Sequence, residues 1–282
     1  MTQQITPQLR QWIVDQAQAG YPPESVLKSM LASGWAEAVA IEAMEATLSS
    51  HLEQTAGQQE LPPTVTVPDA QLDESPLYVD AGDRTVHVLN VMVNPRIVVF
   101  GSLLSDQECE ELIALARPRL ARSLTVATKT GGEEINDDRT SNGMFFQRGE
   151  SDVVRRLEAR LARLLNWPEE NGEGLQILRY RPGAEYKPHH DYFDPIHPGT
   201  PRILERGGQR VGTLVMYLNT PDGGGATTFP DVGLEVAPVR GNAVFFSYDR
   251  AHVSTKTLHG GAPVTAGQKW VATKWLRQGV FI

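Results

Sequence analysis

The chain has 282 residues, a formal net charge of -8 and an isoelectric point near 5.4. This length allows one catalytic domain of ordinary size and a small additional module. The acidic balance argues against nucleic acid as the main partner, because phosphate binding requires a basic face. No apolar run reaches the roughly 18 residues of a membrane span, and the N-terminus lacks the pattern of a secretory signal. We therefore expect a cytoplasmic protein with no membrane partner.

Residues 5–53 predict three short helices, with apolar side chains at helical spacing. The first should begin at Thr6-Pro7 and end at Gly20, the second should run from Pro22 to near Gly34, and the third from about Ala36 to Leu52. The segment resembles compact three-helix modules of the ubiquitin-associated type. We interpret residues 1–53 as an interaction module that binds a protein partner or forms a homodimer.

Residues 54–78 are rich in proline, glutamine, threonine and acidic side chains, and they lack a helical or strand period. This composition predicts a linker. A second domain is then expected over residues 79–282.

The only cysteine, Cys109, excludes an intramolecular disulfide and is typical of a reducing compartment. It lies in the sequence SDQECEELIALA, which has the spacing of an amphipathic helix and a Ser105…Glu108 capping box. We interpret Cys109 as a buried helical thiol and not as a nucleophile.

The second domain has the pattern of many short strands. RTVHVLNV and PRIVVFGSLL read as strands, and helices are expected after Ser105 and over residues 152–165. After Gly174 the chain alternates apolar segments such as LQILRY, RVGTLVMYLN, NAVFFSY and KWVATKWL with turn sequences such as PDGGG and PVRGN. This spacing predicts a β-sandwich or barrel packed on helices. Long crossover helices are missing, which disfavours a doubly wound parallel sheet.

A pair of candidate metal ligands lies in YKPHHDYFDP, residues 186–195. His189 and Asp191 are two positions apart, so on a strand they would point to the same face while His190 points away. The alternative is a pair of solvated polar side chains in a turn.

A third ligand candidate is His259, in LHGGAP at the start of a late strand. Two histidines and one carboxylate on one face suit Fe(II), because three positions stay open for a chelating co-substrate and O2. A structural zinc site would need thiols that the chain lacks. The competing histidine is His252, which we reject because it precedes the polar run VSTKT; His51, His87 and His197 are set aside because of their positions in the chain.

Lys269 follows ten residues after His259 and opens the strand KWVATKWL. An ammonium in an apolar strand requires a partner, because its unpaired burial costs several kcal/mol. A dicarboxylate co-substrate would supply that partner. The alternative is a lysine that protects an exposed edge strand.

Several motifs in this order resemble the prolyl 4-hydroxylase branch of the 2-oxoglutarate/Fe(II) oxygenases. The resemblance covers about residues 90–278 and rests on LQILRYRPGAEYKPHHDYF, GGQRVGTLVMYLN, GGATTFPD, LHGGAPV and GQKWVATKWL. It implies a double-stranded β-helix, or jelly-roll, core with flanking helices. The fold class is therefore expected to be α+β, with the N-terminal three-helix module outside the family core.

The resemblance also implies roles for individual residues. His189, Asp191 and His259 would bind Fe(II), and Lys269 would pair with the far carboxylate of 2-oxoglutarate. Tyr180 and Thr227 match positions whose hydroxyls lie near that carboxylate, although Tyr180 could equally be an aromatic residue packed in a strand. Further matches concern the peptide substrate: Arg210 and Trp275 would lie at the peptide-binding face, and Arg139 in a loop that closes over it.

The sequence departs from the family pattern at two places near the expected substrate entrance. Ala226 stands where the family's GGET motif has an acid, and residues 194–209 form a proline-rich loop of their own. The implied activity is procollagen-proline 4-dioxygenase-like hydroxylation of a peptidyl proline with Fe(II), 2-oxoglutarate and O2, releasing succinate and CO2. Ascorbate is a further candidate cofactor.

Three alternatives stay open from the residues alone. The same chemistry could act on another side chain, a free amino acid or a small metabolite. The chain could instead be a non-catalytic metal-binding sensor, or a redox-inactive metalloenzyme such as an isomerase.

Overall fold

The computed structural model describes residues 5–18, 21–58, 61–122, 125–126, 133–134 and 140–282. The chain divides into two compact units, Met1–Leu61 and Pro62–Ile282. Within the described residues, no helix combines the length and apolar character that a membrane crossing requires.

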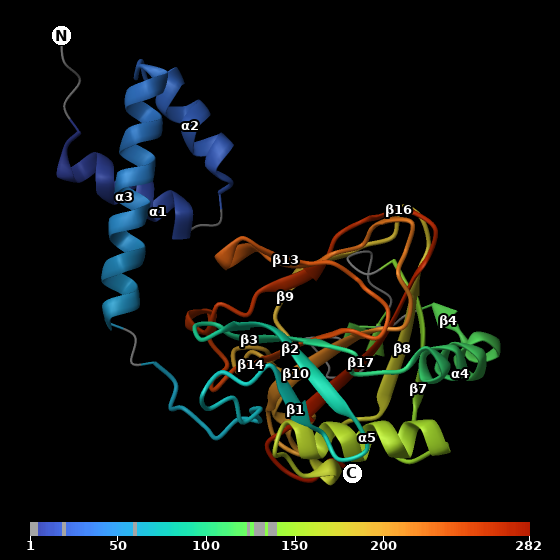
Figure 1. Cartoon of the computed structure of the whole chain (residues 1–282). Coiled ribbons are helices and arrows are strands. Elements are labelled where there is room, and N and C mark those ends of the chain that lie inside the picture. Colours follow the sequence, from blue (N-terminus) through green and yellow to red (C-terminus); the bar gives the residue numbers. More distant parts are fainter. Residues whose placement is uncertain (1–4, 19–20, 59–60, 123–124, 127–132, 135–139) are drawn as a thin grey trace. The chain divides into compact units, whose positions relative to one another are not determined.

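The N-terminal unit contains α1 (Pro7–Gln18), α2 (Pro23–Ala32) and α3 (Glu37–Gln58) around a small core that includes Ile13 and Met30. The three expected helices are present (Figure 1). The last of them runs past the predicted end at Leu52, because Glu53, Gln54 and Ala56 are good helix formers and no proline interrupts the segment. Gly20 lies outside the described residues.

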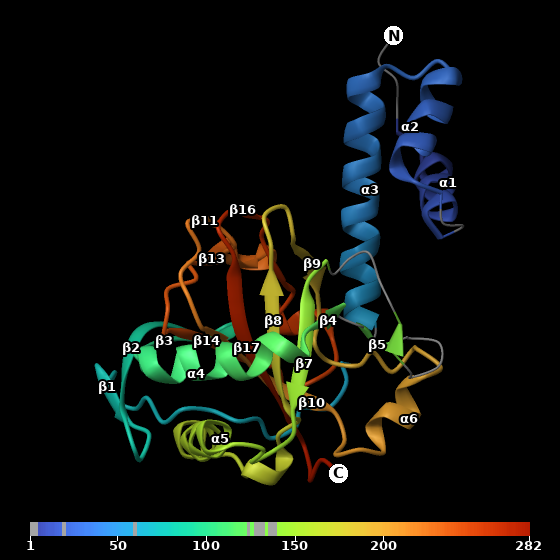
Figure 2. The same ribbon diagram turned by 90° about the vertical axis from the view of Figure 1, so that its right-hand side faces the viewer.

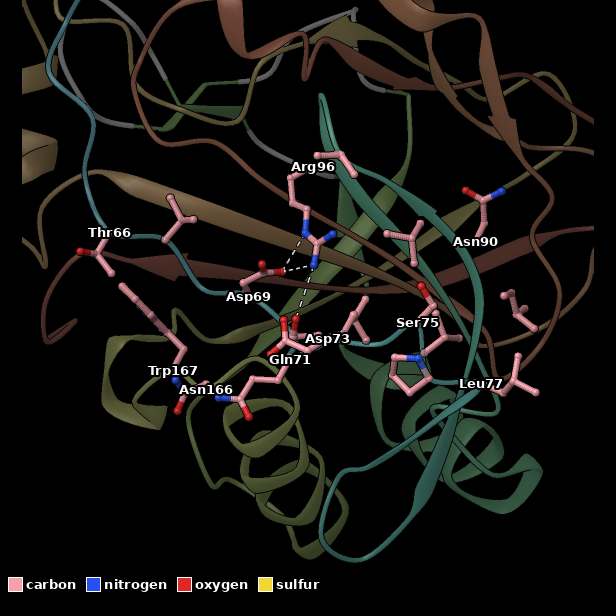
Figure 3. A pocket seen from close by; sticks show the side chains of 18 residues that line it. Thr66, Asp69, Gln71, Asp73, Ser75, Leu77, Asn90, Arg96, Asn166 and Trp167 are labelled. Atoms are coloured by element: carbon pink, nitrogen blue, oxygen red, sulfur yellow. Dashed lines mark hydrogen bonds and ion pairs between the residues drawn. The ribbon is translucent and has the colours of Figure 1, made fainter.

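The segment after Leu61 belongs to the second unit and is not a free linker. The amide of Val65 donates to the carbonyl of Asp249 at 2.8 Å, and Asp69 forms an ion pair with Arg96 at 2.8 Å. Figure 3 shows this ion pair beside a hollow of about 850 Å³ that the segment forms with β2 (Thr85–Met92) and Trp167. The predicted linker, residues 54–78, is therefore wrong at both ends.

The second unit is a double-stranded β-helix built from a large and a small antiparallel sheet (Figures 1 and 2). The large sheet has nine strands in the order β1 (Tyr78–Asp80), β2, β3 (Arg96–Gly101), β14 (Ala243–Ser247), β10 (Arg210–Tyr217), β17 (Lys269–Arg277), β8 (Leu175–Tyr180), β7 (Asn142–Phe146) and β4 (Ala121–Arg122). The small sheet has the order β13 (Leu234–Val236), β12 (Thr227–Phe229), β15 (His259–Gly261) and β9 (Tyr186–His189). Two short ladders complete it, β11 (Gly223–Gly224) with β16 (Val264–Ala266) and β5 (Thr125–Val126) with β6 (Glu133–Glu134).

Helices α4 (Asp106–Ala116) and α5 (Asp152–Leu164) pack against one face of the large sheet (Figure 2). α4 begins at the expected capping box, in which Ser105 and Glu108 exchange hydrogen bonds of 3.1 and 2.9 Å. Cys109 is a fully buried free thiol, as predicted, and burial raises the pKa of this thiol to about 11. The short helix α6 (Thr200–Leu204) lies in the proline-rich loop.

The other face of the large sheet packs on the small sheet around a second, more aromatic core that includes Tyr217, Phe229 and Phe246. β17 is central, between β10 and β8, and its side chains alternate between the two cores. Trp270, Ala272 and Leu276 join the helix-covered core. Lys269, Val271, Thr273 and Trp275 instead line a hollow between the two sheets.

Candidate active site

The two sheets bring three metal-ligand side chains to one end of this hollow. β9 ends at His189 and β15 begins at His259, and these two residues are direct partners in the antiparallel register. Asp191 lies two residues beyond the end of β9, so the expectation that it would be on the strand is wrong. It nevertheless turns to the same side as His189.

The three side chains are close enough to share one ion. The distance from His189 Nε2 to Asp191 Oδ1 is 3.5 Å, and from His259 Nε2 to Asp191 Oδ2 it is 3.4 Å. All candidate ligand atoms lie within 4.8 Å of one another, and no second group of this kind occurs among the described residues. This is the arrangement of two histidines and one carboxylate that suits Fe(II).

Both histidines are held in the tautomer that a metal requires. Nδ1 of His189 lies 2.9 Å from the carbonyl oxygen of Lys187, and Nδ1 of His259 lies 3.0 Å from that of Thr257. A carbonyl can only accept, so each Nδ1 carries the proton and each Nε2 offers a lone pair toward Asp191. Burial lowers the pKa of His259 to about 4, which keeps this imidazole neutral at pH 7.

The carboxylate is held by a second layer of hydrogen bonds. Burial by itself would raise the pKa of Asp191, but the nearby His259 and His189 bring it well below its ordinary value. The hydroxyl of Thr213 donates to Asp191 Oδ2 at 2.7 Å, and it lies 2.9 Å from the hydroxyl of Tyr248. Neither hydroxyl could be assigned from the sequence, because Thr213 lies on β10 and Tyr248 directly follows β14, both distant in the chain from Asp191.

One wall beside the triad is aromatic. The ring of Tyr186 stacks on that of His189 with centroids 3.7 Å apart, and the ring of Phe246 lies 4.5 Å from that of His259. Neither aromatic residue was singled out from the sequence, although Tyr186 was within the motif that contains the ligands. The rejected histidine, His252, accepts a hydrogen bond from the amide of Ser254 and is not part of the triad.

Lys269 lies at the far end of the same hollow and is only 4% exposed. Its ammonium is 5.5 Å from the ring of Tyr180 and 5.7 Å from that of Tyr217, and no carboxylate in the described part of the chain pairs with it. Burial lowers the pKa of Lys269 to about 8. The edge-strand alternative fails, because β17 has a hydrogen-bonded neighbour on each side.

Two hydroxyl groups lie near this ammonium. Tyr180 is the direct register partner of Lys269 on β8, and Thr227 Oγ1 accepts a hydrogen bond of 2.8 Å from Tyr217. The hollow thus has three neutral or anionic metal ligands at one end and a buried cation with hydroxyls at the other. A small dicarboxylate that chelates a metal would satisfy both ends.

Comparisons with known proteins agree with this geometry. The family model of the 2OG-Fe(II) oxygenase superfamily matches residues 175–277. Prolyl 4-hydroxylase 5 of Arabidopsis thaliana is 40% identical over 216 residues, which are 69% of this chain and 72% of that protein. Prolyl 4-hydroxylase 1 of the same plant is 43% identical over 203 residues, or 66% and 70% of the two chains. The chain belongs to the prolyl 4-hydroxylase family.

A solved structure supports the same assignment for this hydroxylase. The 2OG complex of a viral collagen prolyl hydroxylase from Paramecium Bursaria Chlorella virus-1 superposes with a TM-score of 0.51 and 29% identity, covering 64% of this chain and 95% of that one. The hydroxylase is therefore a 2-oxoglutarate-dependent dioxygenase whose cofactors are Fe(II), 2-oxoglutarate and O2. The unpaired Lys269 and the tautomers of the two histidines fit that cofactor set.

The remaining expected residues of the hydroxylase lie in different surroundings. Trp275 lines the hollow, and its indole N–H has no hydrogen-bond partner in the described structure. Arg210 lies behind it, with its guanidinium 4.0 Å from the Trp275 ring and bonded twice to Glu173, at 2.6 and 2.9 Å. The structure thus places the guanidinium of Arg210 in an ion pair with Glu173, against the Trp275 ring. Arg139 lies outside the described residues.

Proposed function

We propose that the protein hydroxylates a proline residue of a peptide, at the prolyl 4-position, with release of succinate and CO2. The observation that carries this proposal is the single hollow that joins the His189–Asp191–His259 triad to Lys269. A sensor that used its metal only for structure would not need a buried, unpaired cation at the other end of the hollow. An isomerase would not need one either.

In this proposal His189, Asp191 and His259 would hold Fe(II). Lys269 would pair with the distal carboxylate of 2-oxoglutarate, and the hydroxyls of Tyr180 and Thr227 would assist as donors. The bound iron and 2-oxoglutarate supply the oxidising chemistry, with one atom of O2 entering succinate and the other the substrate.

The chain's own residues position and protect this chemistry. Thr213 and Tyr248 fix the carboxylate of Asp191, so that the ligand keeps one orientation with or without metal. Tyr186 and Trp275 shield the hollow from water on the side where substrate would enter. The N–H of Trp275 is a free donor for a peptide carbonyl, and we propose from the family resemblance that Arg139 also contacts the substrate.

The experiment that tests the proposal is an anaerobic titration of the protein with Fe(II) and 2-oxoglutarate, followed by addition of O2 and a proline-containing peptide. We expect a weak visible charge-transfer band, succinate, and a peptide heavier by one oxygen on proline. His259→Ala should lose both the band and the product. Succinate without any modified proline would favour another substrate, and no band under any condition would refute the assignment.

We further propose that α1–α3 form an interaction module, through which the protein forms a homodimer or binds a partner protein. Leu31 and Ile41 support this, because they are large apolar side chains that stay exposed on its helices. Sedimentation of the full chain and of a Leu31→Glu variant tests dimerisation: equal masses for the two would contradict it.

We also propose a cytoplasmic location, supported by the single buried cysteine, and a role for ascorbate as reductant of iron oxidised in turnovers without substrate. Cell fractionation tests the first. Loss of activity over successive turnovers, prevented by ascorbate but not by a thiol, tests the second.

A further inference from the structure

A second hollow, of about 820 Å³, lies next to the catalytic one and has an unusual composition. Five arginines, four phenylalanines and one glutamate are among its lining residues, although the whole chain carries a net charge of -8. We call it the arginine groove. Its lining comes from the ends of β7 and β17, the residues before β8, the start of β10, α6 and the C-terminal segment, and its arginines are Arg148, Arg202, Arg206, Arg210 and Arg277.

The floor of the arginine groove is rigid and retains positive charge. Glu173 is bonded to both Arg210 and Arg277, so one carboxylate faces two guanidinium groups. Each arginine also lies over the ring of Phe193, at 4.7 and 4.8 Å. Stacking and ion pairing fix these two guanidinium groups in place and leave their combined charge above zero.

Three further arginines at the rim have no carboxylate side chain as partner in the described residues. Arg148 donates to the backbone oxygen of Glu170, and Arg206 donates at 2.7 Å to an oxygen of Ile282 while lying over the ring of Phe281. Arg202, on α6, is exposed and forms no hydrogen bond or ion pair within the described structure. The rim therefore presents cationic groups to whatever enters the groove.

The arginine groove adjoins the catalytic hollow at Trp275. The indole of Trp275 lines the catalytic hollow, and its other contacts are Arg210, at 4.0 Å, and Phe145, at 6.4 Å between ring centroids. Both contacts are groove residues. A peptide whose proline lies over the triad would thus have neighbouring residues within reach of the groove.

We propose that the arginine groove binds the part of the substrate that flanks the target proline and selects acidic side chains there. This inference rests on the proposed function and narrows it to an acidic, proline-containing peptide. Carboxylates would pair with Arg202 and Arg148 at the rim, and apolar neighbours would pack on the exposed Phe145. Cationic peptides would meet like charge and be disfavoured.

The test uses pairs of proline-containing peptides that differ only in Glu or Gln at one position, scanned along both sides of the proline. Oxygen incorporation is located by mass spectrometry, and kcat/KM is measured for each peptide with the full chain. We expect an advantage of about fivefold or more for Glu on one side of the proline, and a smaller one at high salt. Arg202→Glu should abolish or invert that preference, and Arg148→Gln should reduce it.

The matched control is Arg155→Glu, which makes the same charge change on the exposed face of α5, outside the groove. It should keep the preference for Glu. Equal rates for Glu and Gln peptides, or an unchanged preference in Arg202→Glu, would overturn this inference while leaving prolyl hydroxylation intact. If no peptide gained oxygen on proline, the proposed function would fail and this inference with it.

Discussion

The two faces of β17 carry two buried lysines that differ in one respect. Lys274 points into the helix-covered core, where its ammonium lies 2.5 Å from a carboxylate oxygen of Glu158 on α5 and also donates to the carbonyl of Glu173. Lys269, five residues earlier, points into the catalytic hollow and has only two aromatic rings nearby. Lys274 is 2% exposed and Lys269 is 4% exposed. The two side chains are thus almost equally buried, but they differ in their partners.

This difference separates a structural cation from one that waits for a ligand. A buried ammonium loses the favourable hydration of its charge, and an internal carboxylate restores part of that loss at Lys274. No group of the described chain restores it at Lys269, where burial lowers the pKa to about 8. In the proposed function, a dianionic co-substrate would compensate this unfavourable charge on binding.

The largest expected effect concerns the three metal ligands at one end of the catalytic hollow. His259→Ala or Asp191→Ala removes one of three ligands, and succinate production should fall by about 1,000-fold or more. Stopped assays of succinate, with Fe(II) binding measured in parallel, check this. His252→Ala is the control and should keep near-normal activity, because His252 only caps a short turn. Similar losses in both variants would show that the triad is misassigned.

Replacing each lysine singly with methionine should distinguish the lysine that stabilises the fold from the lysine that binds the co-substrate. Lys274→Met removes the cation that pairs with the buried carboxylate of Glu158, which keeps a hydrogen bond from the amide of Gly149, and should lower the free energy of unfolding by about 3–5 kcal/mol. Lys269→Met removes an unpaired buried charge, so stability should stay the same or rise. Urea unfolding without ligand measures both.

For the affinity for 2-oxoglutarate, we expect the larger effect from Lys269→Met and the smaller one from Lys274→Met. Lys269→Met should weaken 2-oxoglutarate binding by about tenfold to hundredfold, because a charged hydrogen bond to the carboxylate is lost. Lys274→Met, at temperatures where it is folded, should bind the co-substrate normally. Calorimetric titration measures both affinities. Equal affinities in the two variants would contradict the assignment of Lys269 as the co-substrate's cation and Lys274 as a structural one.

The lowered pKa of Lys269 predicts that the affinity for 2-oxoglutarate depends on pH. The free enzyme must hold the Lys269 proton to bind a dicarboxylate, so affinity should fall by about tenfold per pH unit as pH rises above about 8. Between pH 8 and 10.5, the ordinary lysine value, the unfolded chain binds a proton that the folded chain has released. The stability of the ligand-free protein contributed by this group should therefore rise with pH in that window.

Lys269→Arg provides the control for this pH dependence, since an arginine stays charged throughout the range. Titrations of 2-oxoglutarate from pH 7 to pH 10 would check both proteins. An affinity of the unmodified protein that does not change over this range would show that Lys269 does not contact the co-substrate.

The smallest expected effect comes from the layer behind the metal ligands. Thr213→Val removes the 2.7 Å hydrogen bond to Asp191 with little change in volume. We expect iron affinity to fall by about tenfold, because second-layer partners typically contribute that much to metal binding. Competition with a chelator measures it. Unchanged affinity would mean that the carboxylate is oriented by its other neighbours alone.

Short sequence patterns were sufficient to predict features that depend on only a few neighbouring residues. The capping box before α4, the strand LQILRY and the pairing of His189 with Asp191 could all be predicted in this way. His259 and Lys269 required the order of several motifs, because nothing in their own neighbourhoods distinguishes a ligand from a packed side chain. The second unit begins at Pro62 and not at residue 79 as expected, since composition does not reveal that Asp69 pairs with Arg96.

The family and its cofactors could be read from short motifs in a fixed order, because such motifs need no knowledge of the packing. The partners of each buried charge could not be read from the motifs and come from the packing of the strands and helices. This packing places Glu173 against Arg210 and Arg277, Glu158 against Lys274, and no carboxylate of the described residues against Lys269. Folding brings together segments that are far apart in the chain, and these contacts create the ion pairs. The free energy of burying a charge depends on whether such a partner is present.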